Sequence, residues 1–171
     1  MKIAGIDPGL NTTGYGIIEV YDREVVLLEG GVIRAGGTAN SLEARLSRLY
    51  DGLIEVLNQF TPEAMALEEL YSHYERPTTA ILMGHARGVI CLAAARSAIP
   101  VFSYASTQIK SCLTGNGRAS KQQMQQAIQA RLRLKELPNP HDVADALAAA
   151  ICHYWTASSP IMADISKTSA S

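Results

Sequence analysis

The first ten residues, MKIAGIDPGL, limit most strongly how this chain can fold. An apolar run ends at Asp7, and Pro8 and Gly9 follow it. Because proline has no N–H for sheet pairing and glycine adopts turn conformations freely, the pattern predicts a buried strand that stops at Asp7. An aspartate after a strand commonly serves only to form a turn. Asp7 is therefore a functional candidate only if other acidic residues gather beside it.

The rest of the chain predicts a mixed five-stranded α/β sheet flanked by helices. Further strands are expected at residues 13–20, 24–34, 64–67 and 100–104. Helices are expected at residues 42–60, 78–97, from 106, 121–132 and 140–155. We expect Asn40 and Ser120 to cap two of them. Three early strands in an antiparallel meander, followed by alternating strands and helices, give this fold class.

The length of 171 residues suits one domain with a sizeable core, which we expect to span residues 1–155. Residues 156–171 are rich in Ser, Ala and Thr and are expected to be a disordered tail. No run of 18 apolar residues and no signal-peptide pattern is found, so we expect a cytoplasmic location. Cys91, Cys112 and Cys152 are odd in number and widely spaced, which predicts buried thiols rather than disulfides or a zinc site.

The net charge of −1 hides an uneven distribution of charge along the chain. Residues 77–135 contain no Asp or Glu. The basic residues in this stretch are Arg87, Arg96, Lys110, Arg118, Lys121, Arg131, Arg133 and Lys135. A long stretch of one sign favours a polyanionic partner, with nucleic acid the first candidate. The alternative is basic residues scattered over a solvated surface.

Three further acidic residues are candidates to join Asp7. Glu68 follows the predicted strand at residues 64–67, and Asp142 and Asp145 are spaced to lie on one face of a helix. Asp142 alone is more typical of an ordinary helix start than of a functional site, whereas Asp145 lies among apolar residues and needs a partner or a metal. Carboxylates suit Mg²⁺ or Mn²⁺, and two such ions can clamp the attacking and leaving oxygens of a phosphodiester. Together with the basic stretch, the set predicts a metal-dependent nuclease.

With these acidic and basic residues in place, the sequence closely resembles the RuvC family of Holliday junction resolvases, which have a ribonuclease-H-like fold. The resemblance covers about residues 2–154 and rests on the motifs GIDPG with TGYG, ALEE, GHARGV and DVADALA, in that order. It implies that the four acidic metal-binding positions are Asp7, Glu68, Asp142 and Asp145. Some relatives carry His at the position of Asp142, and His141 stays outside the predicted ligand set.

The resemblance also implies which residues contact DNA. Tyr71 matches an aromatic position that stacks on a base near the crossover, and Lys110 and Lys121 match lysines near the scissile phosphate. Arg118, in the glycine-containing loop at residues 114–120, is a further candidate because it is basic. From position alone, Tyr71 is as compatible with packing in the core, and the lysines with simple solvation.

The implied activity is that of a crossover junction endodeoxyribonuclease acting in homologous recombination and DNA repair. A homodimer would bind four-way junction DNA and make paired symmetric nicks by hydrolysis, leaving 5′-phosphate and 3′-hydroxyl ends. Two Mg²⁺ ions are expected in each active site, with Mn²⁺ able to substitute. The branch-migration proteins RuvA and RuvB are the implied partners.

Three other classes are weighed against this interpretation. Sugar-kinase and actin-like ATPases also end their first strand in Asp-x-Gly, but they need a second lobe that 171 residues do not hold. A ribonuclease-H-fold nuclease acting on RNA is a closer alternative, against which the Glu68-Glu69 pair and the Asp-x-x-Asp spacing count. A junction-binding scaffold without activity would not need all four acids.

Overall fold

The structure is a computed structural model that describes residues 1–37, 39–69 and 77–158. The strands are β1 (Lys2–Asp7), β2 (Thr12–Tyr21), β3 (Glu24–Arg34), β4 (Ala64–Glu68) and β5 (Val101–Tyr104). The helices are α1 (Leu42–Phe60), α2 (Pro77–Arg96), α3 (Ser106–Thr114), α4 (Lys121–Leu132) and α5 (His141–Ala157). The order of strands and helices agrees with the sequence prediction.

The five strands form one mixed sheet in the order β3-β2-β1-β4-β5. β1, β2 and β3 are an antiparallel meander, whereas β4 is parallel to β1 and β5 is parallel to β4. The predicted mixed five-stranded sheet is therefore confirmed. Because β1, β4 and β5 run in the same direction, their carboxyl ends lie together at one edge of the sheet, where loops commonly build ligand sites in α/β proteins.

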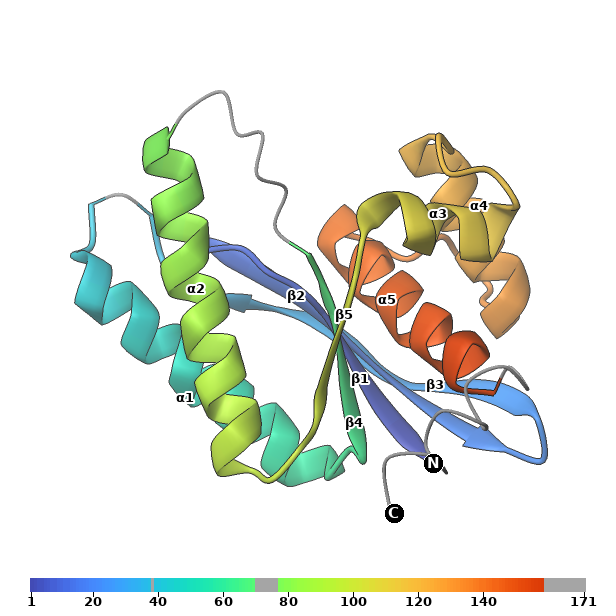
Figure 1. The fold of residues 1–171 in the computed structure, drawn as a ribbon, viewed down its shortest axis with the longest axis horizontal. Helices are drawn as coiled ribbons and strands as arrows, with labels where there is room; N and C mark the ends of the chain where they lie inside the picture. Colours follow the sequence, from blue (N-terminus) through green and yellow to red (C-terminus); the bar gives the residue numbers. More distant parts are fainter. Residues whose placement is uncertain (38, 70–76, 159–171) are drawn as a thin grey trace, which may run out of the picture.

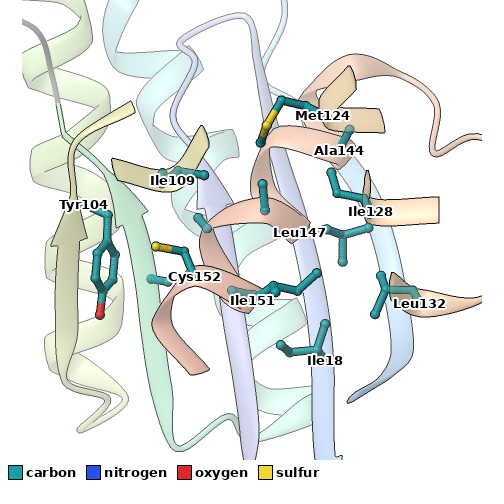
Figure 2. Close-up of a cluster of buried hydrophobic side chains, with 14 of the residues drawn as sticks. Ile18, Tyr104, Ile109, Met124, Ile128, Leu132, Ala144, Leu147, Ile151 and Cys152 are labelled. Atoms are coloured by element: carbon teal, nitrogen blue, oxygen red, sulfur yellow. The ribbon is translucent and has the colours of Figure 1, made fainter. Parts of the chain in front are cut away.

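Helices cover both faces of the sheet (Figure 1). α1 and α2 lie over one face, and α3, α4 and α5 lie over the other. Figure 2 shows the core on the α5 side, where Leu147 and Ile151 of α5 pack with Ile18 of β2 and Ile128 of α4. α5 is buried along most of its length and packs mainly against β1 and β2.

Glycines in the sheet allow α5 to approach this closely. A Cβ atom on Gly5 would lie 1.9 Å from the main-chain oxygen of Ala146, and one on Gly16 would lie 2.5 Å from the Leu147 side chain. A larger residue at Gly5 would force the helix away from the sheet because it meets main-chain atoms, and one at Gly16 would displace the Leu147 side chain from its packed position. The contact of helix on sheet thus depends on glycine in β1 and β2.

Some local predictions were wrong. The side chain that caps α1 is Ser41, which accepts a hydrogen bond from the Ala44 N–H, whereas Asn40 donates to the Gly37 carbonyl. α5 continues to Ala157, two residues beyond the expected boundary, and the Thr156 hydroxyl donates to the Cys152 carbonyl. Of the three cysteines only Cys152 is fully buried. Residues 159–171 lie outside the described part of the chain.

One described helix, α2, is long and apolar enough to cross a membrane when judged by length and composition alone. This is weak evidence for a membrane span, because core helices of soluble proteins pass the same test. Only 22% of the residues in Thr78–Arg96 are buried in this chain. One side of α2 packs into the core through Ala86, Ile90, Ala93 and Ala94. Much of its remaining apolar surface is therefore exposed.

Candidate active site

Asp7 and Glu68 lie side by side at the carboxyl edge of the sheet. They are the last residues of β1 and β4, which pair in parallel with Ile6 opposite Leu67. Both side chains are half-buried. The turn after Asp7 is held by Thr13, whose hydroxyl donates to the Gly9 carbonyl at 2.6 Å and accepts from the Gly9 N–H at 3.3 Å. The backbone behind the Asp7 carboxylate is therefore fixed by the core and by a closed turn.

The N-terminal end of α5 brings the other two acids to the same place. Gly14 is the register partner of Asp7, and a Cβ atom on Gly14 would lie 2.1 Å from the main-chain oxygen of Asp142. This contact sets the first turn of α5 against the strand that pairs with β1. Asp145 follows one turn later and is half-buried, so it is less enclosed than its apolar neighbours suggested.

The electrostatics show that the four carboxylates share one environment. The pKa of Asp7 is raised from 3.8 to about 8, first by burial and then by the negative charges of Asp145, Glu68 and Asp142. The pKa of Asp145 is raised by burial and by Asp142, against the opposing effect of Lys121. Like charges held close together disfavour ionisation, so this site has a strong preference for a cation or a proton.

Glu68 is similarly perturbed. Burial raises its pKa and Asp145 raises it further, whereas a hydrogen bond from Ser106 and the charges of Lys110 and Lys121 lower it. Ser106 is the first residue of α3, directly after β5. Nothing in the sequence distinguished Ser106 from an ordinary residue at a helix start, so its contact with Glu68 was not anticipated.

The donor set fits a hard divalent cation, because it consists of carboxylate oxygens alone. Within the described residues, no group of three or more His, Cys, Asp and Glu side chains converges closely enough to be a ready-made metal cage. The observation that supports a metal site is therefore the electrostatic coupling of the four acids, together with their place at the sheet edge. Carboxylates with raised pKa values are a common feature of functional sites.

The predicted DNA-contacting residues divide into three groups. Lys110 is half-buried on α3, and Lys121 is exposed at the start of α4. The positive charges of both lysines lower the pKa values of Glu68 and Asp145, so both lie at the site. Arg118 is exposed in the loop between those helices, where its main-chain N–H donates to the side-chain oxygen of Asn116. Tyr71 lies outside the described residues, so its role stays a prediction.

The acid-free stretch does not form one continuous basic surface. Arg133 pairs with Glu24 at 3.7 Å, and the Arg131 guanidinium lies 4.8 Å from the centre of the Trp155 ring. Glu24 begins β3, beside the end of β2, and therefore belongs to the end of the sheet opposite the carboxylates. The sequence predicted a single basic stretch for a polyanionic partner, because the order of residues along the chain does not reveal which end of a helix faces the site.

Comparison with known proteins decides the family. A family model described as "Crossover junction endodeoxyribonuclease RuvC" matches residues 3–153. The chain belongs to the RuvC family. A relative of the same description from Rhodopirellula baltica is 51% identical over 159 residues, covering 93% of this chain and 89% of the relative.

Solved RuvC structures also match the fold. The Thermus thermophilus RuvC structure is 36% identical, with a TM-score of 0.84, and the match covers 92% of this chain and 95% of that one. T. thermophilus RuvC in complex with Holliday junction substrate gives a TM-score of 0.86 at 36% identity, with coverage of 92% and 94%. The ribonuclease-H-like fold and the nuclease class predicted for this RuvC family member are confirmed, and family membership sets aside the ATPase alternative.

Proposed function

We propose that this RuvC family nuclease resolves four-way DNA junctions with Asp7, Glu68, Asp142 and Asp145 as its metal-binding residues. The observation that carries the proposal is the place of Asp7 at the sheet edge, where burial, and then the negative charges of Asp145, Glu68 and Asp142, raise its pKa to about 8. Partly buried carboxylates that also repel one another are matched to a divalent cation. Mg²⁺ is the proposed ion, with two in each site, and Mn²⁺ is proposed to substitute.

When bound, the metal ions would polarise the scissile phosphate and stabilise the attacking and leaving oxygens of its hydrolysis. The chain's own residues supply the scaffold for this chemistry. β1 and β4 present Asp7 and Glu68 from a rigid sheet, and α5 presents Asp142 and Asp145 from the opposite side. Rigid elements hold such ligands more accurately than loops do.

Lys110 and Lys121 are proposed to contact the DNA backbone beside the carboxylates. Both are positive charges close enough to oppose the raised pKa of Glu68. A phosphate placed between them and the metal site would receive positive charge from two directions, which favours binding of the phosphate and stabilises the transition state. Arg118 on the neighbouring loop, and Tyr71, are proposed to extend this DNA surface.

The proposed homodimer is supported by the exposed face of α2. Ile81 and Leu92 on this helix are 61% and 53% exposed. Gly84 and Gly88 lie on the same face between them, and a Cβ atom at either glycine would meet nothing within 4 Å. An apolar helical face with a flat centre suits close packing against a second copy of itself. A twofold dimer would present two cutting sites to a junction of nearly twofold symmetry.

Two further assignments rest on family membership alone: association with RuvA and RuvB, and a cytoplasmic location. Co-purification of tagged RuvA or RuvB with this chain, with and without junction DNA, would test the first.

The direct test of function compares substrates. A synthetic four-way junction, labelled in turn on each strand, is incubated with the protein and Mg²⁺ beside a linear duplex and an RNA–DNA hybrid of the same sequence. We expect nicks in two opposing strands at symmetric positions, with products that a DNA ligase can seal. Equal cleavage of the linear duplex or of the hybrid would contradict the proposal.

A further inference from the structure

Arg87 joins the helix α2 to the ends of two strands at the active site. Its Nη1 donates to the main-chain oxygen of Glu68 at 2.7 Å, and its Nη2 donates to the Ser103 hydroxyl at 2.6 Å. Arg87 is half-buried, in the middle of α2. One guanidinium group therefore bridges β4 and β5 from the side of the sheet that faces away from α5.

The contact to Glu68 fixes the residue at its main chain. Glu68 is the last residue of β4, and the regular strand pairing stops there. A carbonyl at a strand end has fewer neighbours to hold it than one inside the ladder. The charged guanidinium offers a stronger hydrogen bond than a neutral donor does, and its planar fork fixes the direction of both bonds.

The contact to Ser103 extends the same support to β5, which is the edge strand of the sheet. Ser103 lies three residues before Ser106, which lowers the pKa of the Glu68 carboxyl and begins the helix that carries Lys110. Arg87 thus holds the Glu68 main chain directly, and it holds the segment that supplies the partner of the Glu68 carboxylate.

We propose that Arg87 is a positioning residue, which holds Glu68 and the end of β5 in register so that the Glu68 carboxylate points into the metal site. The inference rests on the proposed function, because it assigns Glu68 a ligand role. Arg87 acts through the Glu68 main chain and needs no contact with DNA or metal. Groups that orient metal ligands in this way commonly change metal affinity or activity by about 10–100-fold when removed.

The test compares Arg87→Ala and Arg87→Lys with Arg96→Ala, which removes the same charge from the same helix. Arg96 is exposed at the last residue of α2, the end of the helix that leads into the start of β5 and lies away from the carboxylates. Three quantities are measured: single-turnover junction cleavage, junction affinity with Ca²⁺ replacing Mg²⁺, and Mn²⁺ binding to the DNA-free protein by electron paramagnetic resonance.

We expect Arg87→Ala to lower the cleavage rate and to weaken Mn²⁺ binding, each by about 10-fold or more. Junction affinity should stay within about twofold of that of Arg96→Ala, because no DNA contact is lost. Arg87→Lys keeps one of the two hydrogen bonds and should fall between wild type and Arg87→Ala. Arg96→Ala should match wild type in cleavage and in Mn²⁺ binding.

Several results would overturn the proposal. Wild-type cleavage and Mn²⁺ binding in Arg87→Ala would do so, as would a loss of junction affinity as large as the loss of cleavage, which would place Arg87 on the DNA. If Arg87→Ala sediments as a monomer where wild type is a dimer, the loss of cleavage would come from failed dimer assembly and not from a misplaced Glu68. If Arg87→Ala does not fold, Ser103→Ala decides. This variant removes the Ser103 hydroxyl that accepts a hydrogen bond from Arg87 at an exposed position, and unchanged cleavage and Mn²⁺ binding would overturn the positioning role.

The Glu68→Gln variant separates this inference from the function on which it rests. If Glu68→Gln is inactive while Arg87→Ala behaves like Arg96→Ala, only the role of Arg87 is wrong. If Glu68→Gln cleaves junctions normally, the metal-site proposal itself fails.

Discussion

Gly14 and Asp142 are in direct backbone contact: a Cβ atom on Gly14 would lie 2.1 Å from the main-chain oxygen of Asp142 and 2.4 Å from its carbonyl carbon. Gly14 also pairs with Asp7 across β1 and β2. One glycine therefore sets the distance between the strand that carries the first acid and the helix that carries two others. The geometry of the site depends on a residue that has no side chain.

The first prediction concerns this contact. Gly14→Ala should displace the start of α5, because the clash is with main-chain atoms that cannot rotate away. We expect a loss of about 1–3 kcal/mol in the free energy of unfolding, and a fall in junction cleavage at temperatures where the protein remains folded. Chemical denaturation and single-turnover cleavage measure the two effects.

Gly37→Ala is the matched control, because a Cβ atom at Gly37 meets nothing within 4 Å. It should leave both the free energy of unfolding and the cleavage rate close to wild type. If Gly14→Ala behaves like Gly37→Ala, α5 does not depend on this close approach.

The second prediction concerns pH. Because the pKa of Asp7 is about 8 in the folded protein and 3.8 is its ordinary value, folding binds a proton at intermediate pH. The stability that this proton supplies is complete below about pH 4 and is lost as the pH rises through about 8. In Asp7→Asn the side chain stays neutral at every pH, as the protonated Asp7 carboxyl is. In EDTA, its melting temperature should exceed that of wild type by an amount that grows from pH 5 to pH 8.5.

Thermal melts at a series of pH values check this result, with Asp22→Asn as the control because Asp22 is exposed on the turn between β2 and β3. A difference between Asp7→Asn and wild type that stays constant across the series would show that Asp7 is not under strong electrostatic repulsion in the folded protein.

The third prediction concerns Lys121, whose charge opposes the raised pKa values of Asp7, Glu68 and Asp145. Junction affinity should fall steeply with salt, by about 0.9 log unit per log unit of salt for each phosphate contact. Lys121→Ala should flatten this slope by about one unit if the lysine touches a phosphate. Affinities measured from 50 to 300 mM salt test it, and an unchanged slope would place Lys121 away from the DNA.

The fourth prediction concerns the exposed face of α2. Leu92→Glu should convert the dimer into a monomer, because it puts a charge into the proposed apolar interface. Sedimentation gives the assembly state. Cleavage of a supercoiled plasmid that extrudes a cruciform gives the effect on paired cutting. A dimer should cut two strands and yield linear DNA, whereas a monomer should cut one strand and yield nicked circles.

Val26→Glu is the control for that experiment, because Val26 is 50% exposed on β3, away from α2. It should remain dimeric and produce linear DNA. A Leu92→Glu protein that sediments as a dimer would assign the interface to another surface.

The sequence predicted most of this architecture because its signals are local. Alternating and helical apolar patterns located the strands and helices, and Pro8 with Gly9 located the end of β1. The cap of α1 was misplaced by one residue because Asn40 and Ser41 are both good capping residues. Only the backbone conformation at Ser41 decides between them.

The four candidate acids have signals in the sequence, but the residues that support them do not. Asp7 and Glu68 stand at strand ends, and Asp142 and Asp145 share a helix face, so each has a signal in the sequence. Arg87 and Ser106 carry no such signal, because their partners are a main-chain oxygen and a carboxylate far away along the chain. The approach of Gly14 to Asp142 likewise joins residues more than a hundred positions apart, and it needs three-dimensional structure to be seen.

The carboxylates at the sheet edge are proposed to hold the metal ions needed to cut DNA. The most direct measurement is single-turnover cleavage of a four-way junction by Glu68→Gln in Mg²⁺, beside Glu69→Gln, which neutralises the adjacent exposed acid. We expect Glu68→Gln to bind the junction as wild type does without cutting it, whereas Glu69→Gln should cut it normally. Cleavage by Glu68→Gln at a rate near that of wild type would show that Glu68 does not hold a metal ion needed for cutting.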